Sequence, residues 1–310
     1  MKKRGVGIAS MWYGVGNTGL PNPAGAYLDL LDDGTVIVLS GCADIGQGST
    51  TTLAQIAAEE LGVGVEDVRV ISADTAVTPD AGASSASRQT YISGNAVRLA
   101  AKEAKKVLYE AAAEMLGVSL AEIESGNRML YVKTNSGKSQ SLVDCQAECR
   151  TDLGLAAGQD SRTVSIADCI AKCRAKGKLT LGHGWFNPDT TGLDLETGQG
   201  KPYATYAFAT QIAEVEVDTE TGVVEVIKLV AAHDVGQAIN PLNVVGQIEG
   251  GCAIGLGYAL MEEVQLKEGN VVTNSFTTYL LPTSLDVPDM YPVIVEEPES
   301  TGPFGAKGVG

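Results

Sequence analysis

The feature that most constrains the fold is a pattern that occurs once in each half of the chain. A predicted β-hairpin is followed by an Asp-aliphatic-Gly-Gln motif and then by a predicted helix. The motif spans Asp44 to Gln47 in the first half and Asp234 to Gln237 in the second. Short glycine turns can recur by chance before helices, but the shared order of elements favours two structural repeats.

Local patterns place the elements of both halves. In the first half of the chain we expect strands at 26–31 and 35–40, a helix with Ser49 as N-cap that ends at Gly62, a strand at 68–72 and a helix at 92–117. In the second half we expect strands at 210–218 and 223–230, a helix at 241–262 and a hairpin turning at 268–270. The length of 310 residues suits two domains of ordinary size. We therefore predict an α+β fold with two similar lobes of mixed β-sheet flanked by helices, divided as 1–133 for the first lobe, 134–175 for an insertion and 176–310 for the second lobe.

The acidic balance of the chain limits its partners. The net charge is −16, and residues 211–310 hold 15 acidic side chains against three lysines. Nucleic acids and anionic membranes both bind through clustered lysine and arginine. This distribution disfavours both as partners.

The chain has no predicted export or membrane segment. The basic start from Met1 to Arg4 is followed by Gly5 and Gly7 where a signal peptide needs an apolar run. The longest apolar run, 251–261, is much shorter than the roughly 20 residues of a membrane-spanning helix. Six cysteines in 310 residues are too few for a disulfide scaffold. We expect a soluble, cytoplasmic protein.

Four cysteines form two CxxxC pairs, Cys145 with Cys149 and Cys169 with Cys173. A spacing of four residues places each pair on one face of a helix, where thiolates could bind a metal between two helices. The ten-residue segments 141–150 and 165–174 are also identical at six positions. Tandem duplication of one helix is therefore an alternative explanation that needs no metal.

Common catalytic and nucleotide-binding signatures are absent or out of context. The segment from Gly14 to Gly19 fits GxGxxG, but Pro21 and Pro23 follow where a dinucleotide fingerprint needs a helix. There is no Walker motif and no GxSxG elbow, and His183 and His233 are the only histidines.

The remaining candidate ligand-binding groups lie in three glycine-rich loops near predicted helix starts. They lie at 46–51, 82–90 and 246–251 and contain serine, threonine, glutamine and one arginine. Open backbone amides, hydroxyls, carboxamides and a guanidinium are groups that hold phosphate and polar heterocycles. Each loop alone is more often an ordinary capped turn, but together they suggest a cradle for an extended anionic cofactor.

Five motifs in order resemble the C-terminal molybdopterin-binding half of the xanthine dehydrogenase and aldehyde oxidase family. They lie at 44–48, 79–90, 233–241, 246–250 and 302–310. The opening segment, Ser10 to Pro21, resembles more narrowly the medium molybdopterin subunit of nicotinate dehydrogenases. The resemblance implies a subunit of a molybdenum hydroxylase that adds oxygen from water to an N-heteroaromatic ring, with nicotinate favoured. Xanthine or another purine, or an aldehyde, is the alternative substrate.

The resemblance also implies roles for individual residues. The cofactor, molybdopterin in its cytosine dinucleotide form with molybdenum, would be held by Gly46, Gln47, Gly48, Ser87, Arg88, Gln89, Gln247, Lys307 and Gly308. Ser85 and Ala86 would lie near the metal and substrate because small residues leave space for a planar ring. Tyr13 is a candidate substrate contact or, alternatively, a packed core aromatic.

The remaining parts of such an enzyme are expected elsewhere. The family's catalytic glutamate would directly follow Gly310, while Glu296, Glu297 and Glu299 do not occupy its motif position. The resemblance implies an incomplete C-terminus and partners that supply a large molybdopterin subunit, 2Fe-2S clusters and FAD. A non-catalytic cofactor scaffold is the alternative from another class.

Overall fold

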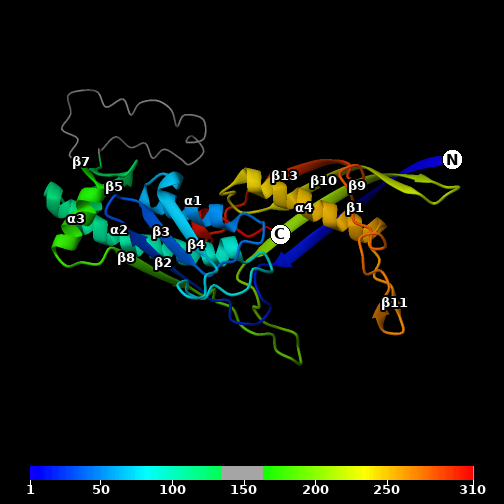
Figure 1. Cartoon of the computed structure of the whole chain (residues 1–310), viewed down its shortest axis with the longest axis horizontal. Helices are drawn as coiled ribbons and strands as arrows, with labels where there is room; N and C mark the ends of the chain where they lie inside the picture. Colours follow the sequence, from blue (N-terminus) through cyan, green and yellow to red (C-terminus); the bar gives the residue numbers. More distant parts are fainter. Residues whose placement is uncertain (134–162, 310) are drawn as a thin grey trace, which may run out of the picture.

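A computed structural model describes residues 1–133 and 163–309 of the chain. Two four-stranded sheets organise these residues, one toward each end of an elongated molecule (Figure 1). The strand orders are β4-β3-β2-β8 in the first sheet and β1-β9-β10-β13 in the second. The strands are β1 (Lys2–Gly14), β2 (Ala24–Leu30), β3 (Val36–Ser40), β4 (Val68–Ser72), β8 (Leu181–Phe186), β9 (Tyr206–Asp218), β10 (Val224–Asp234) and β13 (Asp289–Val295). Helices α1 (Ser49–Leu61) and α2 (Gly94–Leu116) pack on the first sheet, and α4 (Pro241–Leu260) packs on the second.

Both sheets are built by the same connection, and the predicted α+β fold with mixed sheets and flanking helices is confirmed. β2 and β3 form an antiparallel hairpin, α1 crosses over, and β4 returns parallel to β3. β9 and β10 form an antiparallel hairpin, α4 crosses over, and β13 returns parallel to β10. The repeated motif thus joins a hairpin to a crossover helix in both halves.

The edge strands of the two sheets are exchanged between the repeats. β1 precedes the first hairpin, yet it pairs antiparallel with β9 from Lys2 opposite Asp218 to Gly14 opposite Tyr206. β8 precedes the second hairpin, yet it pairs antiparallel with β2. The segments predicted as lobes, 1–133 and 176–310, therefore each contribute a strand to the other's sheet. No strand was predicted at β1.

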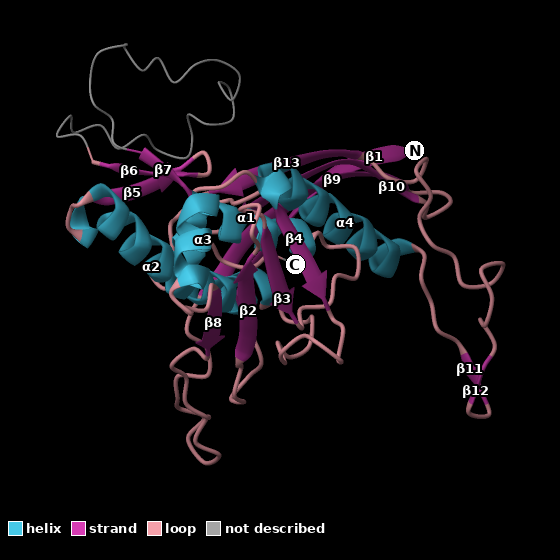
Figure 2. Cartoon of the chain, turned by 60° about the vertical axis from the view of Figure 1, so that its left-hand side comes forward, coloured by secondary structure: helices cyan, strands magenta, loops and turns pink. Residues whose placement is uncertain are grey.

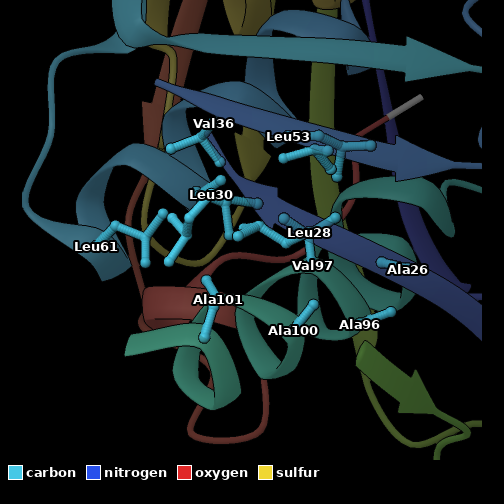
Figure 3. Packing of buried hydrophobic residues seen from close by; sticks show 14 of the residues in the cluster. Ala26, Leu28, Leu30, Val36, Leu53, Leu61, Ala96, Val97, Ala100 and Ala101 are labelled. Atoms are coloured by element: carbon cyan, nitrogen blue, oxygen red, sulfur yellow. The ribbon is translucent and has the colours of Figure 1, made fainter. Parts of the chain in front are cut away.

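The core of the first lobe lies between its sheet and helices α1 and α2. Leu28 and Leu30 of β2 pack with Val97 of α2 and Leu53 of α1 (Figure 3). All four side chains are fully buried. A smaller cluster in the second lobe packs α4 on β10 and β13.

The backbone of strand β8 lies directly against the backbone of helix α2. A Cβ atom built at Gly182 would clash with the carbonyl oxygen of Ala100, and one at Gly184 with that of Ala96. Only glycine therefore fits at these two positions of β8.

The helix ends agree with the predicted glycines but not with the predicted N-cap. Gly62 ends α1 in the left-handed conformation, with φ of 77°, and donates its N–H to Ala58. The prediction of Ser49 as the N-cap is wrong, because Gly48 occupies that position with φ of 78°. Helix α2 begins two residues later than predicted because Gln89–Ser93 forms a π-helical turn, η2.

Part of the predicted insertion belongs to the first lobe. β7 (Thr163–Ser165) pairs with β6 (Met129–Val132), which pairs with β5 (Ile123–Gly126). Helix α3 (Ile166–Ala175) packs against α2. Short 3₁₀ helices lie at η1 (Val65–Asp67), η3 (Leu120–Glu122) and η5 (Pro303–Gly305).

The predicted hairpin at 268–270 is present. β11 (Leu266–Lys267) pairs with β12 (Asn270–Val271) at the tip of an extension that projects from the body (Figure 2). Among the described helices, none combines the length and the apolar character needed to cross a membrane.

The contact between β8 and α2 should make Gly184 indispensable to the fold. We expect Gly184→Ala to lower the free energy of unfolding by about 1–3 kcal/mol, because the clash is with backbone and cannot be relieved by a rotamer change. Chemical denaturation measures this. Gly192→Ala is the control, because nothing described lies within 4 Å of a Cβ there; equal losses in both variants would contradict the close approach.

Candidate functional site

A cavity of about 440 Å³ lies where the loops of both repeats meet. Residues at the start of α1 and the start of α4 line it, together with the loops at 84–90 and 306–309. The side-chain amide of Asn240, which caps α4, donates to Gln55 of α1 at 3.1 Å and so joins the two helices directly. The site is therefore shared between the repeats.

The structure brings most of the predicted site residues to this one cavity. Those that line it are Tyr13, Gln47, Ser85, Ala86, Ser87, Arg88, Gln89, Gln247, Lys307 and Gly308. Gly46 and Gly48 flank Gln47 but do not line the cavity themselves.

Sequence reasoning missed several lining residues from the second repeat. Gln237, Asn240 and Asn243 face the cavity. Gln237 occupies in the second motif the position that Gln47 occupies in the first. A comparison of each predicted site residue with the residue at the equivalent position of the other repeat would therefore have identified Gln237.

The first motif forms a self-supporting turn at the start of α1. The Asp44 carboxylate accepts the N–H groups of Gly46, Gly48 and Thr50 at 2.9, 3.3 and 3.0 Å. Burial raises the pKa of Asp44, but these hydrogen bonds outweigh it and hold the pKa below its ordinary value of 3.8. Asp44 thus supplies the negative charge at this helix N-terminus.

Gln47 is also held by its own loop. Its Oε1 accepts the N–H of Ile45 at 2.7 Å, and its Nε2 donates to the carbonyl oxygen of Ala43 and to Ser49 Oγ at 3.1 and 2.9 Å. Gln47 therefore presents a positioned side chain whose amide already has protein partners.

Arg88 organises the wall of the cavity from inside the protein. It is 1% exposed, and its guanidinium donates to the side chain and carbonyl of Asn22 and to the carbonyl oxygens of Pro23, Ala81 and Ala83. No carboxylate of the described chain forms an ion pair with Arg88. Burial lowers the pKa of Arg88 from its ordinary value. The arginine fixes two loops and leaves a positive charge beside the cavity.

Gln89 extends this organisation to the first motif. Its Nε2 donates to Ser84 Oγ at 3.0 Å, and Ser84 Oγ donates to the carbonyl oxygen of Ala43 at 2.6 Å. The hydroxyl of Ser93 donates to Gln89 Oε1 within the π-helical turn. Such turns occur frequently at functional sites.

The backbone between Ala86 and Ser87 is in an uncommon conformation. Their φ angles are 50° and 54°, in the left-handed region that costs a non-glycine residue roughly 1–2 kcal/mol. Gly308 lies against them, and a Cβ built there would clash with the carbonyl oxygen of Ser87. Two adjacent residues held this way suggest that the shape of the loop serves a function.

In the second motif the aspartate, Asp234, forms an ion pair with a lysine. Lys307 Nζ donates to Asp234 Oδ2 at 2.6 Å, and both side chains are about nine-tenths buried. Asp234 Oδ1 accepts the N–H of Gly236 at 3.0 Å, as Asp44 does for Gly46. The charge of Lys307 is therefore neutralised within the protein.

A different set of groups remains available to a ligand. Their side chains line the cavity and make no hydrogen bond with any residue in the described ranges: Tyr13, Ser85, Ser87, Thr90, Asn243 and Gln247. All are neutral hydroxyls or carboxamides. The cavity thus combines a rigid charged framework with neutral donors and acceptors that suit an extended polar ligand.

The cysteines do not form part of this site. Cys145 and Cys149 lie outside the described residues. Cys169 and Cys173 are buried in the core of the first lobe, and burial raises the pKa of Cys169 to about 12. Within the described chain no group of three or more potential ligands could hold a metal. Burial disfavours the thiolate form of Cys169 and Cys173, and a metal site and a duplicated helix stay the two explanations of the CxxxC pairs.

Two repeated glycine-rich turns, which precede α1 and α4, meet at one cavity. Residues 1–288 match the family described as a molybdopterin cofactor-binding domain. The chain therefore belongs to the molybdopterin-binding domains of the xanthine dehydrogenase family.

Individual relatives agree with this assignment. The xanthine dehydrogenase molybdenum-binding subunit of Escherichia coli O157:H7 is 32% identical over 99% of this chain and 37% of its own length. The gamma subunit of the 6-hydroxypseudooxynicotine dehydrogenase complex of Paenarthrobacter nicotinovorans is 30% identical over 89% of this chain and 31% of its own length. The crystal structure of quinoline 2-oxidoreductase from Pseudomonas putida 86 has a TM-score of 0.78 at 27% identity, covering 99% of this chain and 36% of that one. The chain spans about a third of the length of these proteins.

Replacing Arg88 should destabilise the fold, because its removal leaves buried carbonyl groups without donors. We expect Arg88→Met to lower the free energy of unfolding by about 3 kcal/mol in urea denaturation. Arg69→Met is the matched control, because Arg69 is exposed and forms no ion pair within the described residues. A loss of similar size in both variants would show that the network around Arg88 does not support the loops.

The lowered pKa of Asp44 predicts a pH dependence. A carboxylate with a folded-state pKa below 3.8 stabilises the protein above that pH, and the contribution is lost as pH falls through the folded-state pKa. Asp44→Asn should therefore cost about 1 kcal/mol at neutral pH, and the difference from wild type should shrink below pH 3.8. Urea denaturation across this range measures it. Asp29→Asn, at a side chain without a hydrogen bond in the described chain, should show no such change.

Proposed function

We propose that this chain is the molybdopterin-binding subunit of a heteromeric molybdenum hydroxylase that acts on an N-heteroaromatic substrate, nicotinate in the first instance. The observation that carries the proposal is the convergence of residues from five separate motifs on one cavity. Membership of the molybdopterin-binding family supports it independently.

The residues around the cavity fit such a cofactor. Gly308 lies so close to Ser87 that any side chain there would clash with the Ser87 carbonyl oxygen and displace the cavity wall. Neutral donors at Ser87, Asn243 and Gln247 suit a pterin and a phosphate whose charge is balanced by the buried Arg88. When bound, the cofactor would supply the redox chemistry and the water-derived oxygen of the hydroxylation.

The other residues assigned to the cofactor site in this proposal hold the cavity loops in place. Gln47 and Gln89 hold the loops on either side of the cavity through hydrogen bonds within the protein. Gly46, Gly48 and Lys307 shape the two repeated turns. In this proposal the cofactor is the cytosine dinucleotide form.

Small residues leave room for a planar substrate. Ser85 and Ala86 line the cavity with little side-chain volume, and Tyr13 contributes an aromatic ring from the end of β1. Two relatives are named for quinoline and for 6-hydroxypseudooxynicotine. A substrate with a pyridine ring is therefore preferred here over xanthine or an aldehyde.

The proposed complex is cytoplasmic and contains further subunits. A second, large molybdopterin subunit would complete the site, and other subunits would carry 2Fe-2S clusters and FAD. Relatives named as part of a dehydrogenase complex and as a molybdenum-binding subunit support such partners.

The native complex tests the proposed activity. We expect molybdenum in the purified complex and incorporation of ¹⁸O from labelled water into nicotinate, followed by mass spectrometry. Faster turnover of xanthine or an aldehyde would overturn the substrate assignment. A complex that binds molybdenum but turns over none of these compounds would support the scaffold function instead.

Gln247 should contribute directly to cofactor retention. We expect Gln247→Ala to weaken molybdopterin binding about tenfold, the effect of losing one net hydrogen bond of about 1.4 kcal/mol. Molybdenum and pterin content of the purified complex measure this. Gln199→Ala, in an exposed turn away from the cavity, should retain wild-type content; unchanged content in Gln247→Ala would exclude the contact.

A further inference from the structure

Asn22 is a buried side chain whose amide joins the loop after β1 to Arg88. It is 2% exposed. Its Oδ1 accepts the N–H of Asn17 at 3.1 Å and Arg88 Nε at 3.2 Å. Its Nδ2 donates to the carbonyl oxygens of Asn17 at 3.0 Å and of Leu20 at 3.4 Å. The amide thus uses both of its acceptor positions and both of its donors within the protein.

The backbone that Asn22 holds supports the wall of the cavity in turn. Gly16, next to Asn17, donates its N–H to the carbonyl oxygen of Ala86 at 2.9 Å. Gly16 has φ of 102°, and a Cβ built there would lie 3.0 Å from Asn22 Nδ2. The loop therefore passes directly against the Asn22 amide in a conformation that favours glycine. Asn22 fixes the position of the N–H group that binds Ala86.

The residues supported in this way are in an unfavourable backbone conformation. Ala86 and Ser87 have φ of 50° and 54°. Such conformations persist only where the surrounding contacts determine them. Two contacts act on this turn, the N–H of Gly16 on the Ala86 carbonyl and the close approach of Gly308 to the Ser87 carbonyl. The turn depends on the Gly16 side as well as on the Gly308 side.

The contacts close a ring through Asn22. One path runs from Asn22 through the backbone of Asn17 and Gly16 to the Ala86 carbonyl. The other path follows the chain from Ala86 to Arg88, whose Nε returns to Asn22 Oδ1. Loss of the Asn22 amide would therefore release the turn from both directions at once.

We propose that Asn22 is a positioning residue that holds the Ala86–Ser87 turn in its left-handed conformation and so places the substrate end of the cavity. That end is formed by Ser85 and Ala86 together with Tyr13, which lies in β1 just before the loop that Asn22 holds. Asn22 does not line the cavity itself. The assignment of the substrate end rests on the proposed function, whereas the positioning of the turn does not.

Hydrogen–deuterium exchange of the native protein tests the positioning. We expect Asn22→Ala to raise amide exchange at 14–17 and at 85–88 about tenfold, the effect of one lost hydrogen bond on local opening. Asn17→Ala is the matched control, because the bonds to Asn22 use only the Asn17 backbone. Exchange at 85–88 that is unchanged in Asn22→Ala would overturn the proposal.

Asn22→Asp separates the two contacts and decides the case in which Asn22→Ala does not fold. A carboxylate still accepts the N–H of Asn17 and Arg88 Nε, but it cannot donate to the carbonyl oxygens of Asn17 and Leu20. We expect faster exchange at both 14–17 and 85–88, and unchanged exchange in the core of α2 at 96–104. A rise confined to 14–17, or an equal rise in α2, would show that Asn22 is only a structural partner of Arg88 and would overturn the proposal.

The kinetics of the native complex test the assignment of the substrate end. We expect Asn22→Asp to raise the KM for the heteroaromatic substrate about tenfold while kcat and molybdenum content are retained, because Asn22 touches neither ligand. Loss of molybdenum with an unchanged KM would place the turn at the cofactor and overturn this assignment. If the complex turns over no heteroaromatic compound, the proposed function fails, while the exchange rates still decide the role of Asn22.

Discussion

The pairing of β1 with β9 determines how the rest of the molecule is arranged. It joins residues as far apart in sequence as Ser10 and Thr210, whose hydroxyls lie 3.1 Å apart. Together with the pairing of β8 and β2, it leaves neither repeat with a complete sheet of its own. The two crossover helices are consequently held so that their N-termini meet at one cavity. A shared site follows from the exchange of strands, because neither repeat could position the loops of the other by local contacts.

The cavity separates residues that maintain its shape from residues that can bind. Arg88 and Lys307 are buried and already hydrogen-bonded within the protein. The groups left without protein partners in the described chain are neutral, such as Ser87 and Gln247. A site organised in this way needs little rearrangement on binding, which reduces the entropic cost of holding a large cofactor.

The sequence predicted the parts of this structure that depend on local pattern. Hairpins, crossover helices and the glycine ends of α1 and α2 follow from turn residues and apolar spacing near in sequence. β1 was missed because its basic start and interior glycines give no clear alternation, and its partner lies two hundred residues away. Residue types placed Arg88 and Gln47 in the site, but only the packing of Asn22 and Pro23 shows that the Arg88 donors are used internally.

The two copies of the Asp-aliphatic-Gly-Gln motif show how a repeated scaffold can acquire an asymmetric site. Both aspartates accept the N–H of the glycine two residues later, so the turn itself is the same in both repeats. The second carboxylate oxygen differs: that of Asp44 accepts the N–H of Thr50 in α1, and that of Asp234 binds Lys307. The first turn is thus tied to its own helix, and the second to the loop that follows β13. Because one shared turn geometry supports two different connections, the duplicated framework can hold the two sides of an asymmetric cofactor with different groups.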